Sequence, residues 1–236
     1  LKPEELEAAI TDRSKILVLP FPNNPTGSIM TREDLKAIAD IVIKHDLYVL
    51  SDEIYGELTY EGRHTSIASL PGMKERTILV SGFSKAYAMT GWRMGYLCAP
   101  APLAAQMLKL HQFGIMSAPT TAQYAAIEAL RNGDDDIAYM RDQYDMRRRL
   151  VVGSLNKMGL TCFEPKGAFY CFPCIKSTGL SSEEFCTKLL HSKRVALVPG
   201  SAFGDCGEGF VRLSYSYSLK HLKKALTLIE EFLKEL

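Results

Sequence analysis

The stretch that decides the fold is residues 81–96, which read Ser-Gly-Phe-Ser-Lys-Ala-Tyr-Ala-Met-Thr-Gly-Trp-Arg-Met-Gly-Tyr. It follows the apolar run 77–80, which predicts a short buried strand. A lysine, hydroxyls and glycines at the end of such a strand are poor material for a hydrophobic core. This composition indicates a rigid site in which the amine of Lys85 is held beside a phosphate or a carboxylate.

Two apolar runs upstream of this stretch predict further strands that also end in polar residues. Residues 16–20 predict a parallel strand buried on both faces, and it runs into a turn-rich loop that contains Asn24. Residues 47–50 predict the next strand, and it ends in a segment with Asp52 and Tyr55. Each strand therefore delivers polar side chains at its carboxyl end.

The strands alternate with predicted helices, which favours an α/β fold with a mainly parallel sheet. Thr31 is a good N-cap for the first intervening helix, with Asp34 three residues later. Residues 94–99 follow the previous strand too closely for a helical crossover, so we expect them to pair in the antiparallel sense. Ligands of open parallel sheets bind beyond the carboxyl ends of the strands. We therefore expect one rim of the sheet to gather Asn24, Asp52, Tyr55, Ser81, Ser84 and Lys85.

The polar segment 131–136 is the best candidate for a domain boundary, which predicts domains 1–136 and 137–236. A long helix of about residues 137–158 opens the second domain. It contains the tight basic cluster Arg147–Arg149, which we expect on the solvated face of that helix. The rest predicts a small α+β domain, with strands near 161–163, 168–172, 195–198 and 210–215, a capped helix from residue 181, and a final amphipathic helix after residue 218.

Composition narrows the class of protein further. The 236 residues are 47% hydrophobic and 23% charged, as in ordinary globular proteins, and no apolar segment is long enough to span a bilayer. A formal net charge of +1 gives no support to a nucleic-acid or membrane partner. The six cysteines do not suggest a disulfide framework, and Cys171 and Cys174 lack the second pair that a zinc site needs. We interpret them as reduced thiols of a cytoplasmic protein, and the five dispersed histidines as structural or exposed.

The motifs together resemble one family. Residues 81–96 are similar to the lysine region of class I/II aminotransferases of the aspartate/aromatic type, which depend on pyridoxal 5′-phosphate (PLP). Four motifs match in order: Asn24-Pro25-x-Gly27, Asp52-x-x-Tyr55, Ser84-Lys85 and Gly91-Trp92-Arg93. The resemblance implies the fold type I, aspartate aminotransferase-like: part of a large domain with a mainly parallel sheet, followed by a small C-terminal α+β domain.

The resemblance also implies a role for each matching residue. Lys85 would form the Schiff base with PLP and then shuttle a proton, for which desolvation and a nearby cation favour a neutral amine. A carboxylate must face the pyridine nitrogen to keep it protonated, and Asp52 matches that position. Tyr55 and Asn24 would donate hydrogen bonds to the phenolic oxygen of the cofactor. Ser81 and Ser84 would bind the cofactor, and Arg93 would hold its phosphate. Arg212, with Asn24, would bind the α-carboxylate of the substrate.

The implied function is transfer of an amino group between an L-amino acid and a 2-oxo acid, by a homodimer. A PLP-dependent C–S β-lyase on the same fold is an alternative, although residues 88–93 look like those of aminotransferases. A second alternative is a truncated, non-catalytic piece, or the ligand-sensing part of a regulator. The sequence opens inside a predicted helix and does not begin with methionine. Members of the family that it resembles are longer, and their upstream part supplies a turn that binds the phosphate and an aromatic ring that stacks on the cofactor. We therefore expect the 236 residues alone to bind PLP weakly or not at all and to be inactive.

Overall fold

The computed structural model describes all 236 residues, and they form two compact units. Unit 1 consists of residues 1–22 and 29–139, and unit 2 of residues 23–28 and 140–236. Each unit has its own sheet and its own core. The predicted division into domains 1–136 and 137–236 stays a prediction.

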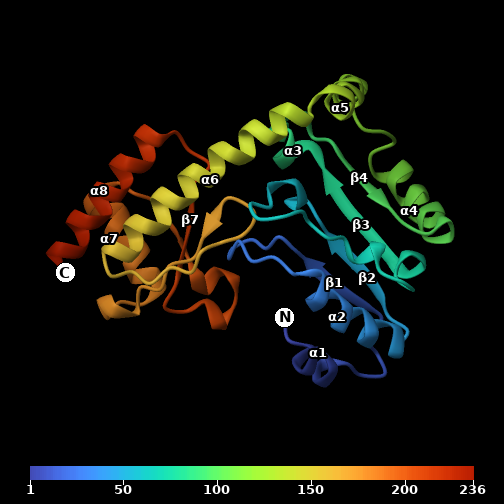
Figure 1. The fold of residues 1–236 in the computed structure, drawn as a ribbon, viewed down its shortest axis with the longest axis horizontal. Helices are drawn as coiled ribbons and strands as arrows, with labels where there is room; N and C mark the ends of the chain where they lie inside the picture. Colours follow the sequence, from blue (N-terminus) through green and yellow to red (C-terminus); the bar gives the residue numbers. More distant parts are fainter. The chain divides into compact units, whose positions relative to one another are not determined.

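Unit 1 is built on a four-stranded sheet in the order β1-β2-β3-β4 (Figure 1). The first three strands run parallel, and the fourth is antiparallel to the third, as predicted. The bounds are β1 (Ile16–Pro20), β2 (Tyr48–Asp52), β3 (Thr77–Gly82) and β4 (Gly95–Cys98). The predicted α/β class with a mainly parallel sheet is confirmed.

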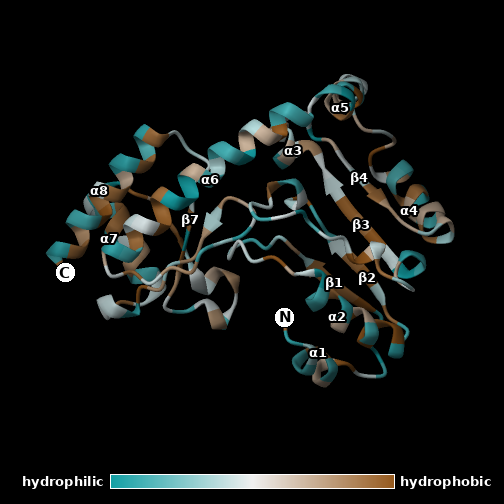
Figure 2. Ribbon diagram, in the orientation of Figure 1, coloured by the Kyte–Doolittle hydropathy of each residue, from teal (hydrophilic) through white to brown (hydrophobic).

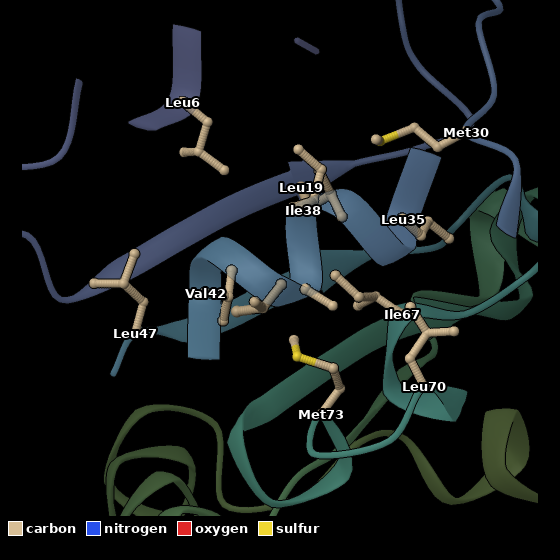
Figure 3. Close-up of a cluster of buried hydrophobic side chains, with 12 residues drawn as sticks. Leu6, Leu19, Met30, Leu35, Ile38, Val42, Leu47, Ile67, Leu70 and Met73 are labelled. Carbon is tan, nitrogen blue, oxygen red and sulfur yellow. The ribbon is translucent and has the colours of Figure 1, made fainter. Parts of the chain in front are cut away.

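The core of unit 1 lies between the sheet and α2 (Arg32–Lys44). Thr31 and Asp34 form the predicted capping box at the start of this helix. Its buried face carries Leu35, Ile38 and Val42, which belong to the same cluster as Leu19 of β1 and Leu47, the residue before β2 (Figure 3). The other helices of unit 1 are α1 (Pro3–Ala9), α3 (Phe83–Ala86), α4 (Ala101–Gly114) and α5 (Thr120–Asn132).

The opposite face of β1 is not buried, although the strands are strongly apolar (Figure 2). Leu19 is 3% exposed on the core side, whereas Ile16 and Val18 are 53% and 59% exposed. The prediction that this strand is buried on both faces is therefore wrong. A continuous apolar run does not tell how many faces are covered, and here only one is.

Unit 2 has a three-stranded antiparallel sheet in the order β5-β7-β6. The strands are β5 (Tyr170–Cys171), β6 (Val198–Pro199) and β7 (Val211–Ser214). The helices are α7 (Ser182–Lys193), α8 (Leu219–Glu235) and most of α6 (Asp134–Lys157), whose first residues, 134–139, belong to unit 1. The rings of Phe185 on α7 and Phe232 on α8 meet edge to face, with centroids 5.3 Å apart. No helix of the chain has the length and apolar character needed to cross a membrane.

The predicted strand at residues 161–163 does not form. Asn156 at the end of α6 takes the place of a strand partner: its Oδ1 accepts from Cys162 N at 2.9 Å, and its Nδ2 donates to Cys162 O at 3.0 Å. The side chain of one residue thus satisfies the backbone that a neighbouring strand would otherwise pair with.

Candidate functional site

The carboxyl ends of β2 and β3 meet at one edge of the sheet in unit 1. Asp52, the last residue of β2, pairs with Val80 of β3, and Ser81 follows directly. Asp52 Oδ1 accepts from the amide of Ile54 at 3.1 Å, and Ser81 Oγ donates to the carbonyl of Glu53 at 3.4 Å. The structure therefore places two of the predicted site residues on neighbouring strand ends.

Lys85 lies on α3, which begins immediately after β3. Phe83 and Ala86 of this short helix are buried and pack it against the rest of unit 1. Ser84 and Lys85 are only half-buried. Lys85 Nζ lies 5.8 Å from the centroid of the Tyr55 ring, and Tyr55 itself is 5% exposed. The amine and the phenol thus come together at the same strand ends as Asp52 and Ser81.

Gly82 joins the lysine helix to the segment that carries Arg93. It faces Gly95 of β4, and a Cβ atom at Gly82 would lie 3.0 Å from Gly95 Cα, so close that the neighbouring backbone would have to shift slightly. Two residues before this pairing, Arg93 adopts a left-handed conformation (φ 53°), is exposed, and donates from Nη1 to Thr90 O at 2.8 Å. A glycine at position 82 therefore favours the close approach of the two backbones.

Two further predicted residues meet in unit 2. Arg212 Nη1 donates to Asn24 Oδ1 at 2.8 Å. The Arg212 guanidinium carbon also lies 4.6 Å from the Tyr170 ring centroid and 5.1 Å from that of Phe203, while Nε is buried without a hydrogen-bond partner. Asn24 and Arg212 belong to unit 2 and Asp52 to unit 1, so the predicted meeting of Asn24 with Asp52 stays a prediction.

The loop 23–28 belongs to unit 2 because Gly27 docks on a turn of that unit. Gly27 O accepts from the amides of Lys166 and Gly167 at 3.0 and 2.9 Å. Gly27 has a left-handed φ of 71°, and a Cβ atom there would overlap Pro165 Cβ. The glycine of the Asn-Pro-x-Gly motif thus holds the loop that presents Asn24.

Sequence reasoning missed two buried charged groups. Glu53 is 8% exposed, and its carboxylate accepts from the side chains of three residues, including His64. Arg148, expected on a solvated helix face, is 2% exposed and bonds to Asp145, Glu164 and a backbone carbonyl. A glutamate directly after a buried strand was the available signal for the first; nothing along the chain distinguishes Arg148 from its two neighbours.

All six cysteines are unpaired. Cys162 and Cys171 share a side-chain hydrogen bond, which lowers the pKa of Cys162 and, together with burial, raises that of Cys171. Burial raises the pKa of Cys186 to about 11. No three His, Cys, Asp or Glu side chains are grouped so that they could hold a metal ion.

Comparison with known proteins assigns the family. Residues 1–229 match the family described as aminotransferase class I and II. The chain belongs to this family. It is 53% identical to a putative aminotransferase, YugH, of Bacillus subtilis over 229 residues, which cover 97% of this chain and 59% of that protein.

Solved structures of the family share the fold. The aromatic aminotransferase from Pyrococcus horikoshii matches with a TM-score of 0.97 at 48% identity, covering 100% of this chain and 64% of that one. A double mutant of Thermus thermophilus aspartate aminotransferase matches with a TM-score of 0.92 at 39% identity, covering 98% and 60%. The fold is therefore aspartate aminotransferase-like, fold type I, as predicted, and the chain spans about 60% of the length of such relatives.

Proposed function

We propose that this chain forms the lysine-bearing and carboxylate-binding parts of a PLP-dependent aminotransferase. The protein would move an amino group between an L-amino acid and a 2-oxo acid. The observation that carries the proposal is the grouping in unit 1, where the Lys85 amine lies 5.8 Å from the Tyr55 ring centroid beside the strand ends of Asp52 and Ser81.

The donor set of unit 1 fits the chemistry of PLP. The aldehyde of PLP needs an amine, which Lys85 would supply. Its protonated pyridine nitrogen needs a carboxylate, which Asp52 would supply, and its phenolic oxygen needs a donor such as Tyr55. The phosphate would be held by Ser81, Ser84 and Arg93, whose hydroxyls and guanidinium suit an anion. When bound, the cofactor withdraws electrons from the α-carbon of the substrate.

The side chains of the protein would then position the substrate and move its proton. Lys85 Nζ is the group that would accept the proton from the substrate's Cα and return it, acting as general acid and base. The buried anchors Phe83 and Ala86 hold the helix of Lys85 in place, which limits the positions that the amine can take.

Arg212 would bind the α-carboxylate of the substrate. Two aromatic rings hold the guanidinium, and Asn24 occupies Nη1, so the edge formed by Nε and Nη2 is the one suited to a bidentate carboxylate. A buried donor without a partner is costly, and a carboxylate on this edge would satisfy Nε.

The finer assignments are also proposals. Because relatives are named aspartate and aromatic aminotransferases, we propose that the substrate of this protein has an acidic or aromatic side chain. A homodimer is expected from the family resemblance, and a reducing compartment such as the cytoplasm from the six unpaired cysteines.

Borohydride reduction tests the proposal directly, because it fixes even weakly held PLP on the lysine that carries it. After peptide mapping, we expect pyridoxyl label to concentrate at Lys85 rather than at exposed Lys74 of the same unit. The variant Lys85→Arg, which keeps the charge, should lose that label. Equal labelling of Lys74 and Lys85 would contradict the proposal.

Addition of amino acids to the protein at the full length of its relatives then separates transamination from the lyase reaction. An aminotransferase changes the absorbance of the bound cofactor and returns it when a 2-oxo acid is added. Pyruvate formed without an oxo-acid acceptor would favour the β-lyase instead.

A further inference from the structure

Glu53 is the only acidic side chain among the buried residues of the chain. Its Oε1 accepts from Ser51 Oγ at 2.9 Å and from Ser66 Oγ at 2.7 Å, and its Oε2 lies 2.8 Å from His64 Nε2. A carboxylate with both oxygens engaged in this way is committed to the protein. It is therefore not placed to bind a ligand.

The backbone of Glu53 ties the two strand ends together. Its amide donates to Val80 O of β3 at 2.8 Å, and its carbonyl accepts from Ser81 Oγ at 3.4 Å and from Gly56 N at 2.8 Å. Asp52 precedes it directly. Any shift of Glu53 therefore moves Asp52, disturbs Ser81 and opens the turn that carries Tyr55.

The side chain of Glu53 connects this edge to the hydrophobic core. Ser66, its closest partner, caps the 3₁₀ turn Ile67–Ser69, and Ile67 is 1% exposed within the core of unit 1. His64 lies over Gly56, where a Cβ atom would come within 3.1 Å of the imidazole ring. The carboxylate thus clamps the loop that contains Tyr55 from both of its ends.

We propose that Glu53 is a positioning residue that holds Asp52, Tyr55 and Ser81 in the arrangement that receives the cofactor beside Lys85. This inference rests on the proposed function, since those three residues matter only if PLP binds there. It adds a group that touches neither cofactor nor substrate and acts through the residues that do.

The charge of Glu53 suits this role. Burial raises the pKa of the Glu53 carboxyl, but hydrogen bonds from His64, Ser66 and Ser51 and the attraction of His64 outweigh it, so the pKa lies below its ordinary value. The ionised carboxylate accepts from all three partners. A glutamine of the same shape replaces one acceptor with an N–H donor that faces donors.

The test compares Glu53→Gln with Glu7→Gln as a matched control. Glu7 also accepts from a histidine, His45 at 2.7 Å, and from Lys44 at 2.6 Å, but it lies on α1 rather than at the strand ends. Ser66→Ala is a milder variant that removes one donor to Glu53, together with the cap of the turn Ile67–Ser69, and leaves the charge. For each protein, borohydride trapping at increasing PLP concentration gives the half-saturating concentration for label at Lys85.

A second readout is the pH midpoint at which the absorbance of the bound cofactor changes. It reports on the groups that face the cofactor ring and does not follow global stability. Circular dichroism confirms that each variant is folded at the temperature used.

We expect Glu53→Gln to raise the half-saturating PLP concentration roughly tenfold and Ser66→Ala roughly threefold, because a buried network loses one or more satisfied partners. The pH midpoint should move in Glu53→Gln and stay in Glu7→Gln. If Glu53→Gln is unfolded, Ser66→Ala alone decides. The inference is overturned, while the proposed function stands, if the Glu53 and Ser66 variants are folded and keep the half-saturating PLP concentration and the pH midpoint of the wild type. If the wild type itself shows no preferential labelling of Lys85, both the inference and the proposed function are overturned.

Discussion

Replacement of Arg148 by methionine should destabilise unit 2 strongly, although the residue lies in a run of three arginines. Arg148 is 2% exposed, with Nη2 2.6 Å from Asp145 and Nη1 3.0 Å from Glu164. Nη1 also donates to the carbonyl of Pro165 at 2.8 Å. Methionine fills a similar length of space but offers none of these donors.

The expected loss is about 3 kcal/mol, at the low end of the roughly 3–5 kcal/mol found when one partner of a buried ion pair is removed. Two features keep it low. Glu164 is 58% exposed, so water replaces its lost partner, and Asp145 keeps Arg149 at 2.6 Å. The buried carbonyl of Pro165 is left without its donor, which alone costs about 1–3 kcal/mol.

Amide hydrogen exchange of α8 measures the stability of unit 2, and Arg149→Met is the control. Arg149 is 70% exposed and makes one ion pair, so its loss should cost less than about 1 kcal/mol. The free energy of opening should therefore fall by about 2 kcal/mol more in Arg148→Met than in Arg149→Met. Equal losses in the two variants would refute the view that Arg148 is a structural charge.

Three other outcomes follow from the structure. Gly82→Ala should destabilise unit 1 by about 1–3 kcal/mol in urea titrations, since the added methyl meets Gly95 Cα at 3.0 Å, and wild-type stability would contradict this. The pKa of the Glu53 carboxyl in the folded protein lies below its ordinary value, so the ionised carboxylate stabilises the fold above that ordinary value and the stabilisation is lost as the pH falls through the folded pKa. The difference in stability between wild type and Glu53→Gln should therefore shrink on acidification. A difference that stays constant with pH would argue against a stabilising Glu53 carboxylate. Exposed Cys98 should react with iodoacetamide long before Cys186, whose pKa is about 11; mass mapping that finds equal rates would show that burial does not protect the latter thiol.

Local signals predicted the strands of both sheets and several of the helices, although the strand predicted at 161–163 does not form. The capping boxes at Thr31 and Ser181 depend on residues three apart, and both form. The antiparallel pairing of β4 followed from the short connection after β3, which no helical crossover fits. The motif residues Asp52 and Ser81 come to neighbouring strand ends for the same reason, since parallel strands end at one edge.

Signals that depend on distant partners were not available. His64, expected to be structural or exposed, pairs with a carboxylate 11 residues away, and Arg148 reaches a carbonyl 17 residues away. The apolar run of β1 does not reveal that Ile16 and Val18 face outward. Each of these depends on what the fold brings alongside, which neither periodicity nor spacing along the chain records.

In each unit, the proposed site residues lie near one buried charge that sequence reasoning missed. In unit 1, Glu53 fixes the strand ends; in unit 2, Arg148 holds the carbonyl of Pro165, whose side chain packs against Gly27 in the loop of Asn24. Both charges are satisfied by several partners, and neither is free to bind a ligand. Because a buried charge is costly unless its partners stay in place, each one penalises movement of the segment it holds. We therefore expect the chemistry proposed for Lys85 and Arg212 to depend on these two supports as well as on the residues that would touch the cofactor and the substrate.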